Sequence, residues 1–272
     1  MKHGFIFPIA YLEYTTKSDF HLILPHLVEK YPAYKEFYKE RAKQGDHILL
    51  DNSIFEHEVS FDYKKMLEYA EEIGVKEMSA PEVLKDREQS KKLRDEFLDF
   101  YAKSGGKVDI LAVAQGRTCE EVVQSFFELQ NISEIAALGL PFDLDDHNTT
   151  IKSTTLRRVF NRWSVVSTID NYKDFVISIN NGAGIKPTHL MGLSDPLELQ
   201  AYGNNRFPWI RSNDSSSAFV HGFNLIKLTD RGLPGEKISQ KLDFNGYQNI
   251  SLTEEQISAI EHNMSTILNW IK

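Results

Sequence analysis

The segment Trp209-Ile-Arg-Ser-Asn-Asp214-Ser-Ser-Ser-Ala-Phe219 joins a short apolar run to a polar cluster. We interpret Trp209–Arg211 as the end of a buried strand and Ser212–Ser217 as the loop into which it opens. Asparagine, aspartate and serine also favour plain turns, so the segment alone leaves two alternatives. One is a polar turn, and the other is a strand that holds the Asp214 carboxylate rigidly at its mouth. The rest of the chain decides between them.

Eight short apolar runs alternate with helical patterns along the 272 residues, and Trp209–Arg211 is the seventh. We interpret all eight as strands: Phe5–Ile9, His47–Leu50, Glu77–Ala80, Asp109–Ala114, Glu134–Leu138, His189–Leu193, Trp209–Arg211 and Phe223–Leu228. Alternation at intervals of roughly 30 residues favours parallel strands joined by helices. The chain lacks the G-x-G-x-x-G and G-x-x-x-x-G-K-[ST] motifs, which disfavours a dinucleotide-binding or P-loop fold. The pattern predicts one α/β domain over residues 1–272, a (β/α)8 TIM barrel.

The segments between these strands carry helix signals. Ser60 is a candidate N-cap for a helix that Gly74 ends, and Thr118 with Glu121 matches a capping box. A final helix begins near Leu252.

The interval from Pro141 to Lys186 is too long for one ordinary barrel connection. We predict two helices there, Thr154–Val166 and Tyr172–Asn180. They form a helical insertion after the fifth strand.

Composition excludes several classes of protein. Hydrophobic residues make up 41% of the chain, which supports a folded core, and no run approaches the ~20 apolar residues of a membrane helix. The start of the chain lacks a signal-peptide pattern, so we expect a cytoplasmic protein. The single cysteine, Cys119, excludes an internal disulfide and a multi-cysteine zinc site, and we expect neither metal nor cofactor.

The formal net charge of −8 argues against a strongly basic nucleic-acid binder. However, residues 151–241 hold 12 Lys/Arg against 7 Asp/Glu. Such a basic region is either a phosphate-binding footprint or a set of solvated helix faces.

The candidate site residues follow the predicted strands at their carboxyl ends. Asp51 follows the second strand, Glu82 the third, Gln115 the fourth, Gly139 the fifth, and Asp214 the seventh. Each has a plain structural explanation as a cap, turn or loop residue. In an α/β barrel, however, these positions converge on the face that carries the chemistry. Two carboxylates there suit displacement at an anomeric carbon, and a Glu with a Gln suits the edge of a purine.

At these positions the chain resembles the tRNA-guanine transglycosylases, which exchange guanine for a 7-deazaguanine base. The similar segments are Asp51-Asn-Ser-Ile-Phe55-Glu56, Ala114-Gln115-Gly116, Leu138-Gly139-Leu140, His189-Leu-Met-Gly-Leu-Ser-Asp-Pro196 and Ile210–Ala218. Each motif is short, but they occur in the family's order between residues 47 and 228. The tRNA-acting members carry a cysteine-rich zinc site that one cysteine cannot form. One of the family's two adjacent glycines is missing beside Gly139, which would reshape the base pocket. The shorter, zinc-free chain, with its Asp51-Asn-Ser-Ile-Phe-Glu56, Ala80-Pro81-Glu82 and Ser212-Asn-Asp-Ser215 segments, is more similar to the DNA-modifying branch of phages and bacteria.

The resemblance implies a role for each matched residue. Asp214 would be the nucleophile and Asp51 the general acid and base, with a covalent aspartyl-glycosyl intermediate. The residues expected to bind the base are Glu82, Gln115, Gly139, Leu140, Met191, Ser53 and Phe55. Arg206, Arg211, Arg231 and Lys237 are candidates for phosphate contacts. The partners implied are guanine-containing DNA and a free 7-deazaguanine derivative such as preQ0, without a membrane.

Three alternatives stay open. The acceptor could be tRNA or a free nucleoside, the chain could be a non-catalytic subunit, or it could be an unrelated barrel enzyme such as a glycosidase. A homodimer or a partner subunit is compatible with each of them.

Overall fold

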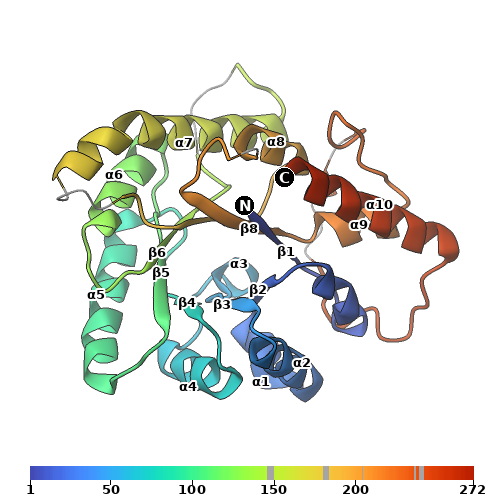
Figure 1. Ribbon diagram of the computed structural model, residues 1–272, viewed down its shortest axis with the longest axis horizontal. Helices are drawn as coiled ribbons and strands as arrows, with labels where there is room; N and C mark the ends of the chain where they lie inside the picture. Colours follow the sequence, from blue (N-terminus) through green and yellow to red (C-terminus); the bar gives the residue numbers. More distant parts are fainter. Residues whose placement is uncertain (146–149, 180–183, 204, 236, 239–241) are drawn as a thin grey trace.

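A barrel of eight parallel strands forms the centre of the molecule (Figure 1). The computed structural model describes residues 1–145, 150–179, 184–203, 205–235, 237–238 and 242–272. The strands are hydrogen-bonded in the order β1-β8-β7-β6-β5-β4-β3-β2, and β1 contacts β2, so the barrel is nearly closed. Their bounds are β1 Lys2–Phe5, β2 Phe20–Ile23, β3 His47–Leu50, β4 Glu77–Ser79, β5 Asp109–Val113, β6 Ala137–Leu140, β7 Thr188–Leu190 and β8 Ile210–Ser215. The predicted (β/α)8 barrel is confirmed.

Helices connect successive strands and surround the barrel on all sides in Figure 1. In chain order they are η1 Ile9–Lys17, α1 Pro25–Lys30, α2 Pro32–Lys43, α3 Ile54–His57, α4 Tyr63–Ile73, α5 Arg87–Ser104, α6 Cys119–Gln130, α7 Thr154–Ile179, η2 Pro196–Glu198, α8 Leu199–Tyr202, α9 Ser217–Phe223 and α10 Glu254–Trp270. Among the described residues, none of these helices is both long and apolar enough to cross a membrane.

Apolar strand residues fill the barrel and the layer between strands and helices. Parallel strands are buried on both faces, which explains why runs such as Ile48–Leu50 and Ile110–Val113 are continuously apolar. A second apolar cluster lies under α9 and α10, where Phe219 meets Ile260. The two helices pack so closely that a Cβ on Gly222 would come within 2.6 Å of the Ile260 backbone.

One strand was missed, one predicted strand is absent, and the first was misplaced, since β1 Lys2–Phe5 shares only Phe5 with the predicted Phe5–Ile9. Phe20–Ile23, which the sequence reading passed over, is strand β2 and is buried throughout. Phe223–Leu228 is no strand: Phe223 ends α9, and Leu225 turns the chain with a φ of 60°. The predicted loop Ser212–Ser217 was also misplaced, because β8 continues to Ser215. Since β8 ends there, too few residues remain before Phe223 for the dozen-residue crossover that another parallel strand requires.

Two helix predictions also need correction. Residues 154–179 form the single helix α7, which is the ordinary connection after β6 and not a pair of added helices. The prediction of a helical insertion is therefore not confirmed, and its last residue, Asn180, lies outside the described residues. Ser60 does not cap α4; Asp62 does, by accepting a hydrogen bond from the Lys64 N–H. By contrast, the Thr118–Glu121 capping box and the end of α4 at Gly74 are present.

Candidate active site

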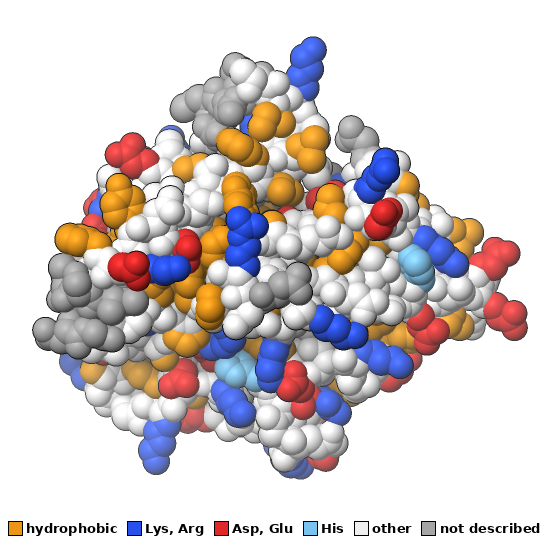
Figure 2. All heavy atoms as spheres, turned by 45° about the horizontal axis from the view of Figure 1, so that its top comes forward, with side chains coloured by type: hydrophobic (Ala, Val, Ile, Leu, Met, Phe, Trp, Pro, Cys, Tyr) orange, Lys and Arg blue, Asp and Glu red, His pale blue; other side chains and the backbone are white. Residues whose placement is uncertain are grey.

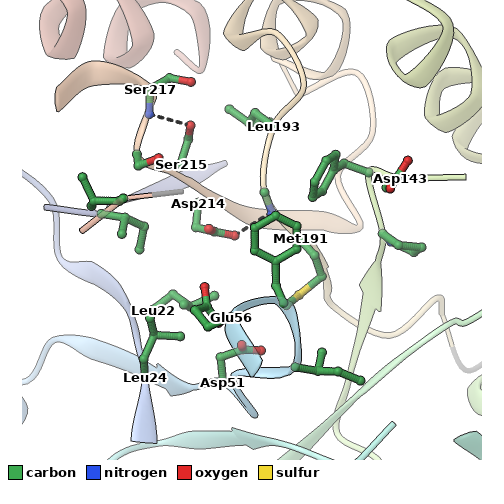
Figure 3. A pocket seen from close by; sticks show the side chains of 18 of the residues that line it. Leu22, Leu24, Asp51, Glu56, Asp143, Met191, Leu193, Asp214, Ser215 and Ser217 are labelled. Carbon is green, nitrogen blue, oxygen red and sulfur yellow. Dashed lines mark hydrogen bonds between the residues drawn. The ribbon is translucent and has the colours of Figure 1, made fainter. Parts of the chain in front are cut away.

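A cavity of about 320 Å³ opens at the carboxyl-terminal end of the barrel. This volume lies within the range of small-molecule binding pockets. Its charged and amide-bearing wall residues are Asp51, Glu56, Glu82, Lys85, Gln115, Asp143, Arg158, Asp214 and Lys237. In Figure 3, Asp51, Glu56 and Asp214 point toward the same space. The barrel thus brings the two predicted catalytic carboxylates and the two predicted purine-binding residues to one cavity.

Asp214 lies within strand β8, so its backbone is held by the sheet and not by a flexible loop. In the ladder Gly4 of β1 is paired with it. The residue is only 9% exposed. One carboxylate oxygen, Oδ1, accepts two hydrogen bonds, from His189 Nε2 at 3.0 Å and from the Gly192 backbone N–H at 2.8 Å. Both bonds go to Oδ1, and no described residue donates a hydrogen bond to Oδ2.

His189 is a site residue that the sequence reading missed. It lies in β7, is fully buried, and is in register with Ser212 of β8. An ionised carboxylate only accepts hydrogen bonds, so His189 Nε2 must donate to Asp214. In a neutral imidazole, Nδ1 then accepts a hydrogen bond from the Ser212 hydroxyl, 2.9 Å away. A polar residue inside an otherwise apolar strand was the available signal, but its partner depends on the register between β7 and β8.

The Gly192 N–H is aimed at Asp214 by a buried ion pair. Gly192 has a φ of +57°, which favours glycine, and a side chain there would press on Phe142. Arg162 of α7 donates to the Gly192 carbonyl at 2.8 Å and to the Met191 carbonyl at 3.1 Å. Its guanidinium also pairs with Glu198 at 2.6 Å, and both side chains are 1% exposed. The Arg162–Glu198 pair therefore holds in place the segment that donates to Asp214.

Asp51 follows β3, and its buried carboxylate has other hydrogen-bond donors than that of Asp214. Its carboxylate accepts hydrogen bonds from the Ser53 N–H at 3.1 Å and the Ser79 hydroxyl at 3.3 Å. Burial raises the pKa of Asp51 from 3.8 to about 6, and the negative charge of Asp214 adds to this shift. A carboxyl group with this pKa exchanges protons near neutral pH, as a general acid and base must.

Glu82 lies at the centre of a buried network of amide groups. Gln115 Nε2 donates to one of its oxygens at 2.9 Å, and Asn52 Nδ2 donates to the other at 3.1 Å. The Ser60 hydroxyl accepts from the Glu82 N–H at 2.9 Å, which fixes the backbone. Burial raises the pKa of Glu82 from 4.5 to about 7. Asn52, which the sequence indicated only as part of the Asp51–Glu56 segment, is therefore a member of the Glu82 network.

The remaining predicted base-binding residues divide into two groups. Met191 and Phe55 line the cavity, and the Phe55 ring meets that of Phe142 edge-on at its mouth. Ser53, Gly139 and Leu140 are fully buried and are not part of the cavity wall. The next residues after β6, Pro141 and Phe142, form the wall instead. Ser53 serves the local fold, because its hydroxyl bonds His26 Nδ1 at 2.8 Å.

Of the four predicted phosphate-binding cations, only Lys237 lines the cavity. Arg211 lies near the amino end of β8 and pairs with Glu77 at 2.6 Å. This pair is at the amino-terminal end of the barrel, whereas the cavity is at the carboxyl-terminal end. Arg206 stacks over the Trp163 ring, and Arg231 is exposed in a turn. On the face shown in Figure 2, acidic side chains lie among the basic ones. These three arginines do not line the cavity, and their predicted phosphate contacts stay a prediction.

Two comparisons with known proteins find no match for this chain. A scan against models of protein families matches none, and a search of curated proteins finds no relative. The chemistry must therefore be argued from the site itself. It offers a rigid carboxylate oxygen, a second carboxyl group that titrates near pH 6, and a buried hydrogen-bonding network beside them.

Proposed function

We propose that this protein is a base-exchange transglycosylase, which replaces guanine in DNA with a 7-deazaguanine derivative. The observation that carries the proposal is the contrast between the two carboxyl groups of one cavity. Asp214 is oriented by two hydrogen-bond donors to a single oxygen, whereas burial shifts Asp51 toward the protonated form. Paired carboxyl groups in contrasting environments are typical of nucleophile and acid/base partners at an anomeric carbon.

The reaction would be a double displacement. Asp214 Oδ2 attacks C1′ of the target nucleotide, the bond from C1′ to the base breaks, and Asp51 gives its proton to the leaving guanine. This forms an ester between Asp214 and the sugar. The incoming 7-deazaguanine gives a proton to the Asp51 carboxylate and attacks C1′, which releases Asp214. Protons and electron pairs balance without any other reactant.

The network around Glu82 supports a purine-like base as the ligand. Its carboxyl and the Gln115 amide supply both acceptors and donors at the cavity wall. Phe55 and Met191 offer apolar surface for a flat ring. A guanine inside a duplex could not reach these groups, so the target must be flipped out or single-stranded. DNA is preferred as acceptor because the sequence is more similar to the zinc-free, DNA-modifying branch.

The test is release of labelled guanine from single-stranded and duplex DNA in the presence of unlabelled guanine. We expect Asp214→Asn to lower the exchange rate by about 10³-fold or more, and Asp51→Asn by about 10²- to 10⁴-fold. Asp99→Asn, an exposed change on α5, is the matched control and should exchange normally. Undiminished exchange by Asp214→Asn would overturn the assignment of the nucleophile. Guanine release that needs no acceptor base would indicate hydrolysis instead.

A further inference from the structure

Lys237 and Arg158 place two positive charges on one wall of the cavity. The Lys237 ammonium and the Arg158 guanidinium each lie 5.5 Å from the centre of the Phe142 ring. All three residues line the cavity. The charge of Arg158 is among the factors that lower the pKa of Lys237, so the two cations are close enough to repel each other. Neighbouring like charges in a cavity wall suit an anionic ligand.

Each cation keeps hydrogen-bonding capacity that the described residues do not use, although Arg158 is paired with Asp143 and the charges of Glu198 and Asp195 act on Lys237. In the described residues, Lys237 Nζ has no carboxylate within ion-pair distance, and it donates to the Leu193 carbonyl at 2.5 Å. Burial lowers its pKa to about 8. Arg158 uses Nε to bond Asp143 at 2.7 Å, and Asp143 also pairs with Lys85. Within the described part of the chain, the terminal guanidinium nitrogens of Arg158 bond no acceptor, which leaves the end that grips phosphate oxygens free.

The position of Lys237 relative to Asp214 limits the size of the ligand. The Gly192 N–H bonds Asp214, and the carbonyl of the next residue, Leu193, bonds Lys237. Adjacent residues are only ~3.8 Å apart from Cα to Cα. In Figure 3, Leu193 and the pair Leu22 and Leu24 lie on opposite sides of Asp214. The cationic wall therefore begins within about one nucleotide's length of the reactive carboxylate.

We propose that Lys237 and Arg158 form a phosphate subsite, which binds a phosphate ester of the nucleotide whose sugar faces Asp214. The subsite rests on the proposed function for the identity of that nucleotide. It also makes the exchange selective for nucleotides over free nucleosides as the source of the sugar.

The experiment measures binding to the intact protein by calorimetry, with 2′-deoxyguanosine and its 5′- and 3′-monophosphates as ligands. At low salt we expect one monophosphate to bind about 10-fold or more tightly than the nucleoside. Lys237→Met and Arg158→Gln should each reduce this preference to about 2-fold or less, while leaving nucleoside binding unchanged. Lys103→Met, an exposed lysine on α5, is the matched control and should keep the full preference. Equal thermal unfolding of all variants would show that the changes are local.

The two proposals can fail separately. A wild-type protein without a preference for either monophosphate, or a preference that survives both substitutions, would overturn the subsite. Phosphate preference that depends on Lys237 in a protein that exchanges no base would uphold the subsite and reject the transglycosylase. A strand-selective enzyme should also lose affinity for an oligodeoxynucleotide on Lys237→Met; if RNA of the same sequence binds more tightly, the subsite stands but the acceptor is RNA.

Discussion

At the residue scale, the site depends on carboxyl groups that experience different surroundings. Asp214 is oriented by His189 and Gly192. Burial raises the pKa of Asp51 and of Glu82 above the ordinary value of each group. Burying a carboxyl group without a cation disfavours its charged form. These shifts are therefore testable both in the reaction and in the stability of the protein.

The raised pKa of Glu82 predicts a pH-dependent stability. In the unfolded chain Glu82 titrates near 4.5, and in the folded protein near 7. Between these values the folded state holds a proton that the unfolded state has lost, so the stability falls as the pH rises through this window. The loss amounts to about 3 kcal/mol. Chemical denaturation at pH 4.5 and pH 8 should show this decline in the wild type and a decline smaller by that amount in Glu82→Gln. Equal declines would contradict the assignment.

His189 should act as a positioning residue through Asp214. His189→Leu removes the donor to Oδ1, and we expect kcat for base exchange to fall roughly 100-fold while KM for DNA stays nearly constant. His189→Gln keeps an N–H group within reach and should recover part of kcat. Steady-state kinetics of the two variants, with thermal unfolding as the check on folding, make the comparison. A purely structural role would lower both variants equally, in proportion to their loss of stability.

At the scale of single elements, β8 and α7 matter most. Strand β8, which is paired with β1 and β7, contains Asp214. Helix α7 contains Arg162, whose guanidinium donates to the Gly192 carbonyl in the segment after β7. Strand β8 was predicted from the sequence with other bounds, whereas α7 was predicted as two separate helices. The apolar signal at Trp209–Arg211 fades before Asp214, because the last residues of β8 are polar and still buried. Strand β2 was missed because it is short, is interrupted by His21, and is separated only by Leu24 from the helix that Pro25 begins.

The buried pair of Arg162 and Glu198 gives a prediction for this scale. Arg162→Met would leave the Glu198 carboxylate buried without its cation, at a loss of about 3–5 kcal/mol in the free energy of unfolding. The double variant Arg162→Met with Glu198→Met removes both charges and should be more stable than the single one. Urea denaturation of the three proteins measures these differences. A loss below about 1 kcal/mol in Arg162→Met would show that the pair does not hold the Gly192 segment.

At the scale of the whole molecule, the barrel explains which site residues were predictable. Asp51, Glu82, Gln115 and Asp214 could be found because parallel strands deliver their carboxyl ends to one face, whatever lies between them in sequence. His189, Arg158 and Phe142 depend instead on strand register and on how the loops fold back over the mouth. Arg211 was misplaced for the same reason, since a residue near the start of a strand points to the other end of the barrel. The order of the strands can be predicted from a sequence, whereas the end of the barrel at which a given strand residue lies requires the structure.

The most direct test of the proposed base exchange is mass spectrometry of nucleosides from DNA incubated with the protein and a panel of free 7-deazaguanines. The proposal predicts that at least one deazaguanine appears as a deoxynucleoside in equal measure with the guanine released. It also predicts that Asp214→Asn abolishes both signals. DNA that contains no modified nucleoside with any base in the panel, under conditions where the protein binds that DNA, would contradict it.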